Sequence, residues 1–416
     1  MKNFSPTGEV FLFCPLNLTH YSSFPWKVWK QYGSYSFSNT PSVQDFVLHS
    51  NFKGITYIYN LSFISMISEK SVYTVESVTS GHPDKMCDQI SDAILDACLA
   101  QDPKSRVAIE SFGAHGLLVI GGELTTDATI NASEIARKVY NDIGYDDDLE
   151  IIERIVKQSP DIAMGVDQDG AGDQGIMYGY ATDETDEFLP KGVTYVHKLT
   201  KGLEDLRKSG ELPWLKPDGK AQVTIKNGRV ASVLISTQHS EDVEQSEIRE
   251  ALIEKLIKPV IGDLTRVDVY VNPTGRFVQG GFYADTGLTG RKLMVDTYGG
   301  LIVHGGGAFS GKDATKVDRS AAYMSRFVAK NIVAAGLAKQ ALVSVAYAIG
   351  HPEPLMVSAV DENGNDLSEY VRNNFDFRPR AIIDRLKLRR PIYQQTATYG
   401  HFGKAGLPWE EVLEAK

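Results

Sequence analysis

The stretch Glu76-Ser77-Val78-Thr79-Ser80-Gly81-His82-Pro83-Asp84-Lys85 stands at the start of the first helix that the sequence predicts. Proline suits the first turn of a helix, because its missing N–H is not needed there and its φ angle is already helical. Apolar residues then recur at helical spacing until Asp102-Pro103, at Met86, Ile90, Ala93, Ile94 and Ala97. This stretch therefore places His82 and Asp84 at a helix N-terminus.

A helix N-terminus offers free N–H groups and positive potential, which suit phosphate oxygens. His82 could hydrogen-bond a leaving oxygen, and the carboxylate of Asp84 is a hard ligand suited to magnesium. The alternative interpretation is a capped helix that carries a histidine and an aspartate on the protein surface.

Outward from this helix the pattern indicates three units. The first adds strands at 106–112 and 117–125 and a helix with Ser133 as its N-cap. The second has helices near 195–206 and 243–256 and a hairpin at Asn227-Gly228, a dipeptide typical of type I′ turns. The third has a helix over 318–335 ended by Gly336, then strands at 342–349 and 355–360. Each third mixes a small antiparallel sheet with helices, which predicts an α+β fold.

The first 70 residues differ in composition from the rest. They are crowded with aromatic residues, carry few acids and keep no helical or alternating apolar period. We interpret residues 1–70 as a disordered extension from a translated upstream region, with Met66 as the natural start. A genuine accessory segment is the alternative.

Composition limits the function classes. A net charge of −10 argues against nucleic acid or an anionic membrane as the main partner. The three cysteines form no Cys-x-x-Cys pair, and no apolar run approaches the length of about 20 residues that spans a membrane. We therefore expect a cytoplasmic protein.

Three further stretches are rich in glycine and charge. Residues 170–175 allow close backbone approach to a ligand beside Asp173, and 285–292 place adjacent Arg291 and Lys292 after two glycines. Residues 305–313 nearly match the P-loop pattern, but Asp313 replaces the hydroxyl residue that would hold magnesium. A P-loop ATPase is thus an alternative, and ordinary loops with solvated charges are another.

In order and spacing these stretches resemble the methionine adenosyltransferase (S-adenosylmethionine synthetase) family. The resemblance runs from about residue 73 to 409 and also includes Gln158-Ser159-Pro160-Asp161, Pro217-Asp218-Gly219-Lys220, Asn272-Pro273-Thr274-Gly275-Arg276-Phe277 and Tyr399-Gly400-His401-Phe402-Gly403. It implies three similar sheet-plus-helix domains around a pseudo-threefold axis, at 71–165, 169–277 and 278–416. It also implies a homodimer or homotetramer with active sites between subunits.

The implied reaction belongs to S-adenosylmethionine biosynthesis and one-carbon metabolism. The sulfur of L-methionine attacks C5′ of ATP, and the released tripolyphosphate is hydrolysed to pyrophosphate and phosphate. Two Mg²⁺ ions per site and K⁺ are expected, with Asp84 and Asp318 for magnesium and Glu110 for potassium.

The resemblance also assigns roles to single residues. The catalytic set is His82, Asp173, Arg291 and Lys312. The ATP contacts are His82, Asp218, Lys220, Arg276, Phe277, Asp285, Arg291, Lys292, Ala308 and Lys312. The methionine contacts are Glu123, Gln158, Asp285 and Lys316.

The chain departs from the family pattern in two places. One is the N-terminal extension, and the other is the segment 162–169, which is shorter than the mobile gating loop of many bacterial members. A homologous subunit that has lost its chemistry is a second functional alternative. Such a subunit is expected to lack residues such as His82, Lys220 or Lys312, which are all present here.

Overall fold

The structure is a computed structural model that describes residues 45–52, 55–62, 72–157 and 170–414. The chain divides into two units, Met1–Lys70 and Ser71–Lys416. In the first unit the described residues are two antiparallel strands, β1 (Asp45–Phe52) and β2 (Ile55–Ser62), paired from Asp45 with Ser62 to Phe52 with Ile55. The β-branched and aromatic residues of these strands favour extended structure. The disorder expected for residues 1–70 stays a prediction.

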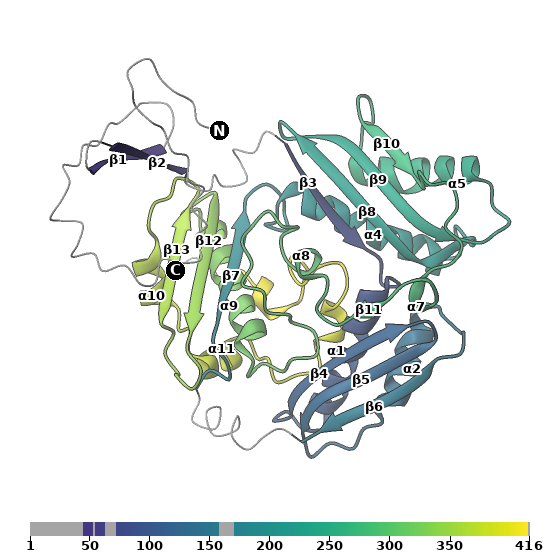
Figure 1. Ribbon diagram of the computed structural model, residues 1–416, viewed down its shortest axis with the longest axis horizontal. Helices are drawn as coiled ribbons and strands as arrows, with labels where there is room; N and C mark the ends of the chain where they lie inside the picture. The colour runs from purple at the N-terminus through teal and green to yellow at the C-terminus, as the bar shows by residue number, and fades with distance from the viewer. Residues whose placement is uncertain (1–44, 53–54, 63–71, 158–169, 415–416) are drawn as a thin grey trace. The chain divides into compact units, whose positions relative to one another are not determined.

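The described residues of the second unit form three sheets (Figure 1). The first sheet has the order β10 (Asp268–Val271), β9 (Arg229–His239), β8 (Leu215–Lys226) and β3 (Val72–Val78). The second has the order β11 (Gly287–Leu288), β4 (Arg106–Ala114), β5 (Leu117–Thr125) and β6 (Glu150–Val156). The third has the order β13 (Met356–Asp361), β12 (Gln340–Tyr347) and β7 (Gly175–Thr182).

Each sheet takes one edge strand from another third of the sequence. β3 precedes the first helix but pairs with β8, β7 pairs with β12, and β11 returns to pair with β4. The exchange is cyclic, so the three sheet-plus-helix units support one another. Each sheet therefore combines strands from two different thirds of the sequence.

Two of the three sheets are mixed, whereas the sequence analysis predicted antiparallel sheets. β5 and β6 run parallel, as do β9 and β10. Parallel neighbours need a crossover connection, and helices provide it here: α2 (Ala132–Ile143) lies between β5 and β6, and α5 (Gln245–Leu252) lies between β9 and β10.

Long helices cover the sheets. α1 (Pro83–Gln101) packs against β4 and α2, α4 (Lys191–Lys208) against β8 and β3, and α9 (Val317–Ala334) against β7 and β12 (Figure 1). The shorter helical elements are α6 (Lys258–Ile261), α7 (Gly281–Ala284), α8 (Leu293–Asp296), α10 (Ser368–Asn374), α11 (Pro379–Arg385), and 3-10 turns at Gln394–Thr396 and Pro408–Glu410.

Local signals are confirmed at several boundaries. Pro83 begins α1, and Gly336, with a φ of 70°, follows the end of α9. Asn227 and Gly228 have φ angles of 49° and 72° between β8 and β9, as a type I′ turn requires. These features depend on only a few neighbouring residues, which is why the sequence predicts them.

Two local predictions need correction. The N-cap of α2 is Asn131, whose side chain accepts the N–H of Glu134, whereas the hydroxyl of Ser133 binds Glu153 on β6. The helix predicted over 243–256 is interrupted: α5 passes into a π-helical turn at Ile253–Ile257 before α6. Pro259 has no N–H to donate to the preceding turn of the helix, and the wider π-helical turn lies just before this proline.

Among the helices of the described ranges, none is long and apolar enough to cross a membrane.

Candidate active site

His82 is the N-cap residue of α1, and this residue is 3% exposed. Its Nδ1 atom accepts the N–H of Asp84 at 3.2 Å. A neutral imidazole has one donor and one acceptor nitrogen, so this bond places the proton on Nε2. The imidazole is therefore a buried donor, which contradicts the alternative of a surface histidine.

Burial is the main cause that lowers the pKa of His82 to about 3; Lys292 and Lys220 also lower this pKa, while Asp285 opposes them. The imidazole is consequently neutral at physiological pH. The charges that act on His82 are those of Lys292, Lys220 and Lys85, which lower its pKa, and that of Asp285, which raises it. Lys292, Lys220 and Asp285 come from distant parts of the chain. A neutral donor beside two lysines suits an anionic ligand.

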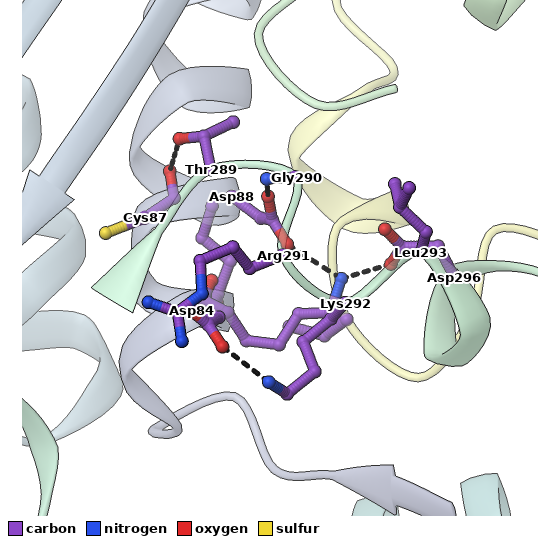
Figure 2. A network of polar contacts seen from close by, with 12 residues as sticks. Asp84, Cys87, Asp88, Thr289, Gly290, Arg291, Lys292, Leu293 and Asp296 are labelled. Carbon is purple, nitrogen blue, oxygen red and sulfur yellow. Dashed lines mark hydrogen bonds and ion pairs between the residues drawn. The ribbon is translucent and has the colours of Figure 1, made fainter. Parts of the chain in front are cut away.

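Asp84 lies one helical position after Pro83 and is 1% exposed. Its Oδ1 accepts the N–H of Leu288 at 3.0 Å, and its Oδ2 pairs with Lys292 at 2.5 Å. Arg291 approaches the same carboxylate, with Nε 3.5 Å from Oδ1 (Figure 2). Asp84 thus joins the start of α1 to the predicted phosphate-binding residues.

Asp218 on β8 is 5% exposed, and its Oδ2 accepts the N–H of Gly281 at 3.1 Å. Burial raises its pKa to about 6, with bonds from Gly281 and the charge of Lys220 acting in the opposite direction. Its Oδ1 has no hydrogen-bond partner among the residues that the structure describes. This oxygen is therefore a buried acceptor without a partner in the described part of the chain.

Two glycines of the segment 305–311 lie too close to neighbouring atoms to carry a side chain. A Cβ on Gly307 would lie 2.2 Å from Oδ1 of Asp318, and one on Gly305 would lie 1.6 Å from the carbonyl oxygen of Ile176. Lys312, at the end of the segment, pairs with Asp318 at 2.7 Å. The glycines therefore bring backbone and Lys312 against the N-terminal turn of α9, which carries Asp318.

This segment meets the loop that carries Arg291 and Lys292. A Cβ on Gly290 would lie 2.5 Å from the Cβ of Ala308, so the two loops are in contact. The structure thereby brings together two cationic loops that are separate in the sequence.

Asp313, which stands where the P-loop pattern has a hydroxyl residue, turns away from the site. It is 2% exposed, its Oδ2 accepts the N–H of Val107 at 2.7 Å, and it pairs with Lys316 at 2.5 Å. Asp313 is therefore a structural link to β4. Because α9 begins only at Val317 and the neighbouring sheet order is not that of a βαβ crossover, the P-loop interpretation does not fit.

Glu110 and Glu123 line a recess of about 400 Å³ on the β4–β5 face. The other lining residues are mostly small or apolar: Ala108, Ser111, Phe112, Val119, Gly121, Gly122 and Leu288. Leu288 connects this recess to the site, since its N–H binds Asp84. The recess offers two acidic groups beside apolar surface.

Other predicted residues lie at the edge of this arrangement or outside it. Arg276 pairs with Glu241 on an exposed surface, and the N–H of Phe277 binds Nε2 of His239. Asp173 is exposed and accepts the N–H of the next residue. Gln158 lies outside the described residues.

Sequence reasoning missed a buried charge cluster beneath the site. Lys85 pairs with Asp88 at 2.9 Å and also with Asp296. Burial raises the pKa of both carboxyls, that of Asp88 to about 7, although Lys85 opposes the shift. The aspartates four residues apart on α1 were a signal that could have indicated a common face.

No group of three or more His, Cys, Asp or Glu side chains able to hold a metal ion occurs in the part of the chain that the structure describes. Magnesium usually binds one or two carboxylates together with substrate phosphates and water. Asp84 and Asp318, each beside a lysine, fit that kind of shared site.

Comparison with known proteins identifies the family. Family models of the S-adenosylmethionine synthetase N-terminal, central and C-terminal domains match residues 70–160, 168–277 and 279–411. The S-adenosylmethionine synthase of Sorangium cellulosum (strain So ce56) is 51% identical over 372 residues, covering 82% of this chain and 88% of the relative. In this family ATP and methionine are the substrates and metal ions are required. The chain therefore belongs to the S-adenosylmethionine synthetase family, and its enzymatic activity is that of a methionine adenosyltransferase.

Proposed function

We propose that the reaction proceeds in two steps at the site between His82 and the two cationic loops. The observation that carries this proposal is a neutral His82 with its Nε2–H as donor, near Lys220 and Lys292. In the first step the methionine sulfur bonds to C5′ of ATP. The C5′–O bond breaks, and its electron pair leaves on the triphosphate oxygen.

His82 donates a hydrogen bond from Nε2 to the oxygen on which charge develops. Lys220 and Lys292 stabilise the same charge electrostatically, and a buried donor needs little reorganisation during the step. The sulfur needs no general base, because a neutral thioether becomes a sulfonium cation without losing a proton. Asp285 and Asp173 are the acids proposed to interact with this cation or with the methionine amino group.

In the second step water attacks the bound tripolyphosphate, a P–O bond breaks, and phosphate and pyrophosphate form. Arg291 and Lys312, from the two cationic loops, hold the phosphate chain, and Arg276 and Asp218 complete the nucleotide contacts. Arginine can bind two phosphate oxygens at once, whereas lysine acts as a point charge.

We assign Asp84 and Asp318 to two magnesium ions and Glu110 to potassium. A carboxylate is a hard oxygen donor that suits these cations, and magnesium would withdraw charge from the phosphate oxygens when bound. Lys292 and Lys312, which pair with the two aspartates, are the groups that would turn to the phosphates in that state.

The recess with Glu110 and Glu123 is the proposed methionine site, with Gln158 and Lys316 as further contacts. Its floor is an open sheet face on which Phe112 is 39% exposed. We propose that a second copy of the chain covers this face, as the family resemblance implies, to form a homodimer or homotetramer. Sedimentation should give at least twice the chain mass of 45.8 kDa.

We also propose that the protein works in the cytoplasm. Cys87 and Cys98 are free and buried, which suits a reducing compartment.

The assignment of the steps is tested with His82→Ala and Arg291→Leu. His82→Ala should slow S-adenosylmethionine formation by about 10² to 10³, the usual loss for one transition-state donor, and largely spare hydrolysis of added tripolyphosphate. Arg291→Leu should slow that hydrolysis by a similar factor. Mass detection of S-adenosylmethionine measures the first rate, and phosphate release from added tripolyphosphate measures the second.

Two results would contradict this proposal in different ways. Equal losses in both steps for both variants would mean that the residues act as one binding unit. A wild-type chain that makes no S-adenosylmethionine with ATP, methionine, Mg²⁺ and K⁺ would support an inactive homologous subunit instead.

Potassium activation is tested with Glu110→Gln. The variant should lose most of the response to potassium while still requiring magnesium, because an amide oxygen carries no charge to attract the cation. The measurement is a potassium titration of the turnover rate at saturating magnesium. An unchanged titration curve would remove Glu110 from the potassium site.

A further inference from the structure

Aspartates recur at every fourth position of α1, at Asp84, Asp88, Asp92 and Asp96. An α-helix has about 3.6 residues per turn, so these side chains follow nearly the same face. Each carboxylate accepts a backbone N–H from the C-terminal third of the chain. We call these four residues the aspartate row.

The second member of the row binds the loop that carries Arg291. Oδ1 of Asp88 accepts the N–H of Gly290 at 2.8 Å (Figure 2). Gly290 has a φ of 79°, a left-handed conformation that favours glycine, and it directly precedes Arg291. The bond therefore fixes the peptide from which the arginine side chain departs.

The third member repeats this arrangement at the other cationic loop. Oδ1 of Asp92 accepts the N–H of Gly311 at 2.8 Å, and Gly311, with a φ of 80°, directly precedes Lys312. Arg319 binds both oxygens of Asp92 at 2.6 and 2.8 Å and donates to the carbonyl of Lys312 at 3.1 Å. The backbone is thus fixed before Lys312 at the Gly311 N–H and after its Cα at the Lys312 carbonyl.

The carboxylates of Asp88 and Asp92 are fully buried, and each has a buried cation as partner. Lys85 neutralises Asp88 and also binds Asp296, at the end of α8, so the Arg291–Lys292 loop is anchored before and after its cations. A buried charge persists only when it is paired and hydrogen-bonded. Because these carboxylates are satisfied by other cations, they hold the two loops without pairing with the side chains of Arg291 and Lys312, which contact Asp84 and Asp318.

We propose that Asp88 and Asp92 are positioning residues, Asp88 for Arg291 and Asp92 for Lys312, and that neither touches the substrate. Each acts by holding the amide of the left-handed glycine that precedes its cation. This inference rests on the proposed roles of Arg291 and Lys312 in phosphate binding. Misplacing a catalytic group by about 1 Å can cost about 10² in rate, so such bonds matter for turnover.

The row also supplies a matched control. Asp96 accepts the N–H groups of Tyr393 and Gln394 at 2.8 to 3.0 Å, in a segment with no proposed site cation. Asp96→Ala removes the same type of bond from the same helix face. It should lower the melting temperature but keep kcat/KM for tripolyphosphate hydrolysis within about twofold, since no phosphate-binding group moves.

The test is a set of double-mutant cycles read out as kcat/KM for tripolyphosphate hydrolysis by the full chain. Asp88→Ala and Asp92→Ala should each reduce it by about 10- to 100-fold. Asp88→Ala should have almost no further effect in an Arg291→Leu background but its full effect in a Lys312→Ala background. Asp92→Ala should have almost no further effect in a Lys312→Ala background but its full effect in an Arg291→Leu background.

Asparagine variants separate the glycine bond from the charge. Asp88→Asn and Asp92→Asn keep an oxygen that accepts the glycine N–H, so kcat/KM should stay within about threefold of wild type. They also carry the test if the alanine variants do not fold. A folded Asp88→Asn as slow as Asp88→Ala would overturn the proposed role of the glycine bond.

Several outcomes overturn the inference. If Asp88→Ala lowers kcat/KM by the same factor with and without Arg291, Asp88 does not act through that arginine. If Asp96→Ala is as slow as Asp88→Ala, the effect is general to the helix. If Arg291→Leu hydrolyses tripolyphosphate at the wild-type rate, the proposed function of Arg291 fails, and the positioning role fails with it.

Discussion

At the residue scale, His82 separates two tasks between its two ring nitrogens. Nδ1 caps α1, and Nε2 carries the proposed donor. Asparagine is also a good N-cap, so His82→Asn should keep the free energy of unfolding at pH 7 within about 0.5 kcal/mol, whereas His82→Ala should lower it by about 1 kcal/mol. Chemical denaturation measures both, and His82→Asn should still form S-adenosylmethionine as slowly as His82→Ala.

The same variant tests the pKa of His82. The folded pKa of about 3 lies below the ordinary value of 6.5, so between these values the unfolded chain binds more protons. His82 therefore makes stability fall as pH decreases below 6.5. Between pH 6.5 and 5 the stability of His82→Asn should decline less steeply, by up to about 1.4 kcal/mol per pH unit. Identical slopes would mean that His82 is protonated or exposed when folded.

At the element scale, the packing of α9 on β7 depends on one glycine. A Cβ on Gly179 would lie 2.0 Å from the backbone carbon of Ser325 and 2.2 Å from the backbone nitrogen of Arg326. Backbone atoms cannot rotate away as a side chain can. Gly179→Ala should therefore lower the free energy of unfolding by about 3 kcal/mol, measured by urea denaturation.

Gly121 on β5 is the matched control for this substitution. A Cβ there would lie 3.6 Å from the carbonyl oxygen of Arg154, an ordinary contact. Gly121→Ala should be neutral or should stabilise the protein by up to about 1 kcal/mol through the unfolded state. Similar losses in both variants would show that glycine matters here for strand conformation and not for the approach of α9.

At the scale of the whole molecule, we expect the N-terminal extension to be dispensable. A chain that starts at Met66 keeps β3, which pairs with β8 from Val72 to Val78. It also keeps everything that the family models match from residue 70 onward. Its melting temperature and turnover should equal those of the full chain, as measured by calorimetry and product formation.

A chain that starts at Thr79 provides the contrast. It lacks β3, so β8 becomes an edge strand with unpaired backbone groups, and the protein should aggregate or melt at a lower temperature. If the chain from Met66 is insoluble or inactive while the full chain works, the extension has a structural role and our interpretation of it is wrong.

The sequence by itself determined the features that depend on neighbouring residues. Pro83 begins a helix, Asn227-Gly228 makes a two-residue turn and Gly336 ends α9, because each requires only the φ preferences of one or two residues. The ordered motifs were also sufficient to identify the family. Ser133 failed as a cap because Glu153, twenty positions away, binds its hydroxyl.

Only the tertiary structure decided which segments share a sheet and which charges are buried together. β3, β7 and β11 each pair outside their own third of the sequence, which short-range patterns do not encode. Asp88 meets Gly290, and Asp313 turns inward to Val107, across about two hundred residues. Desolvation then makes these pairings specific, since a buried carboxylate must find N–H groups and a cation wherever the fold brings them.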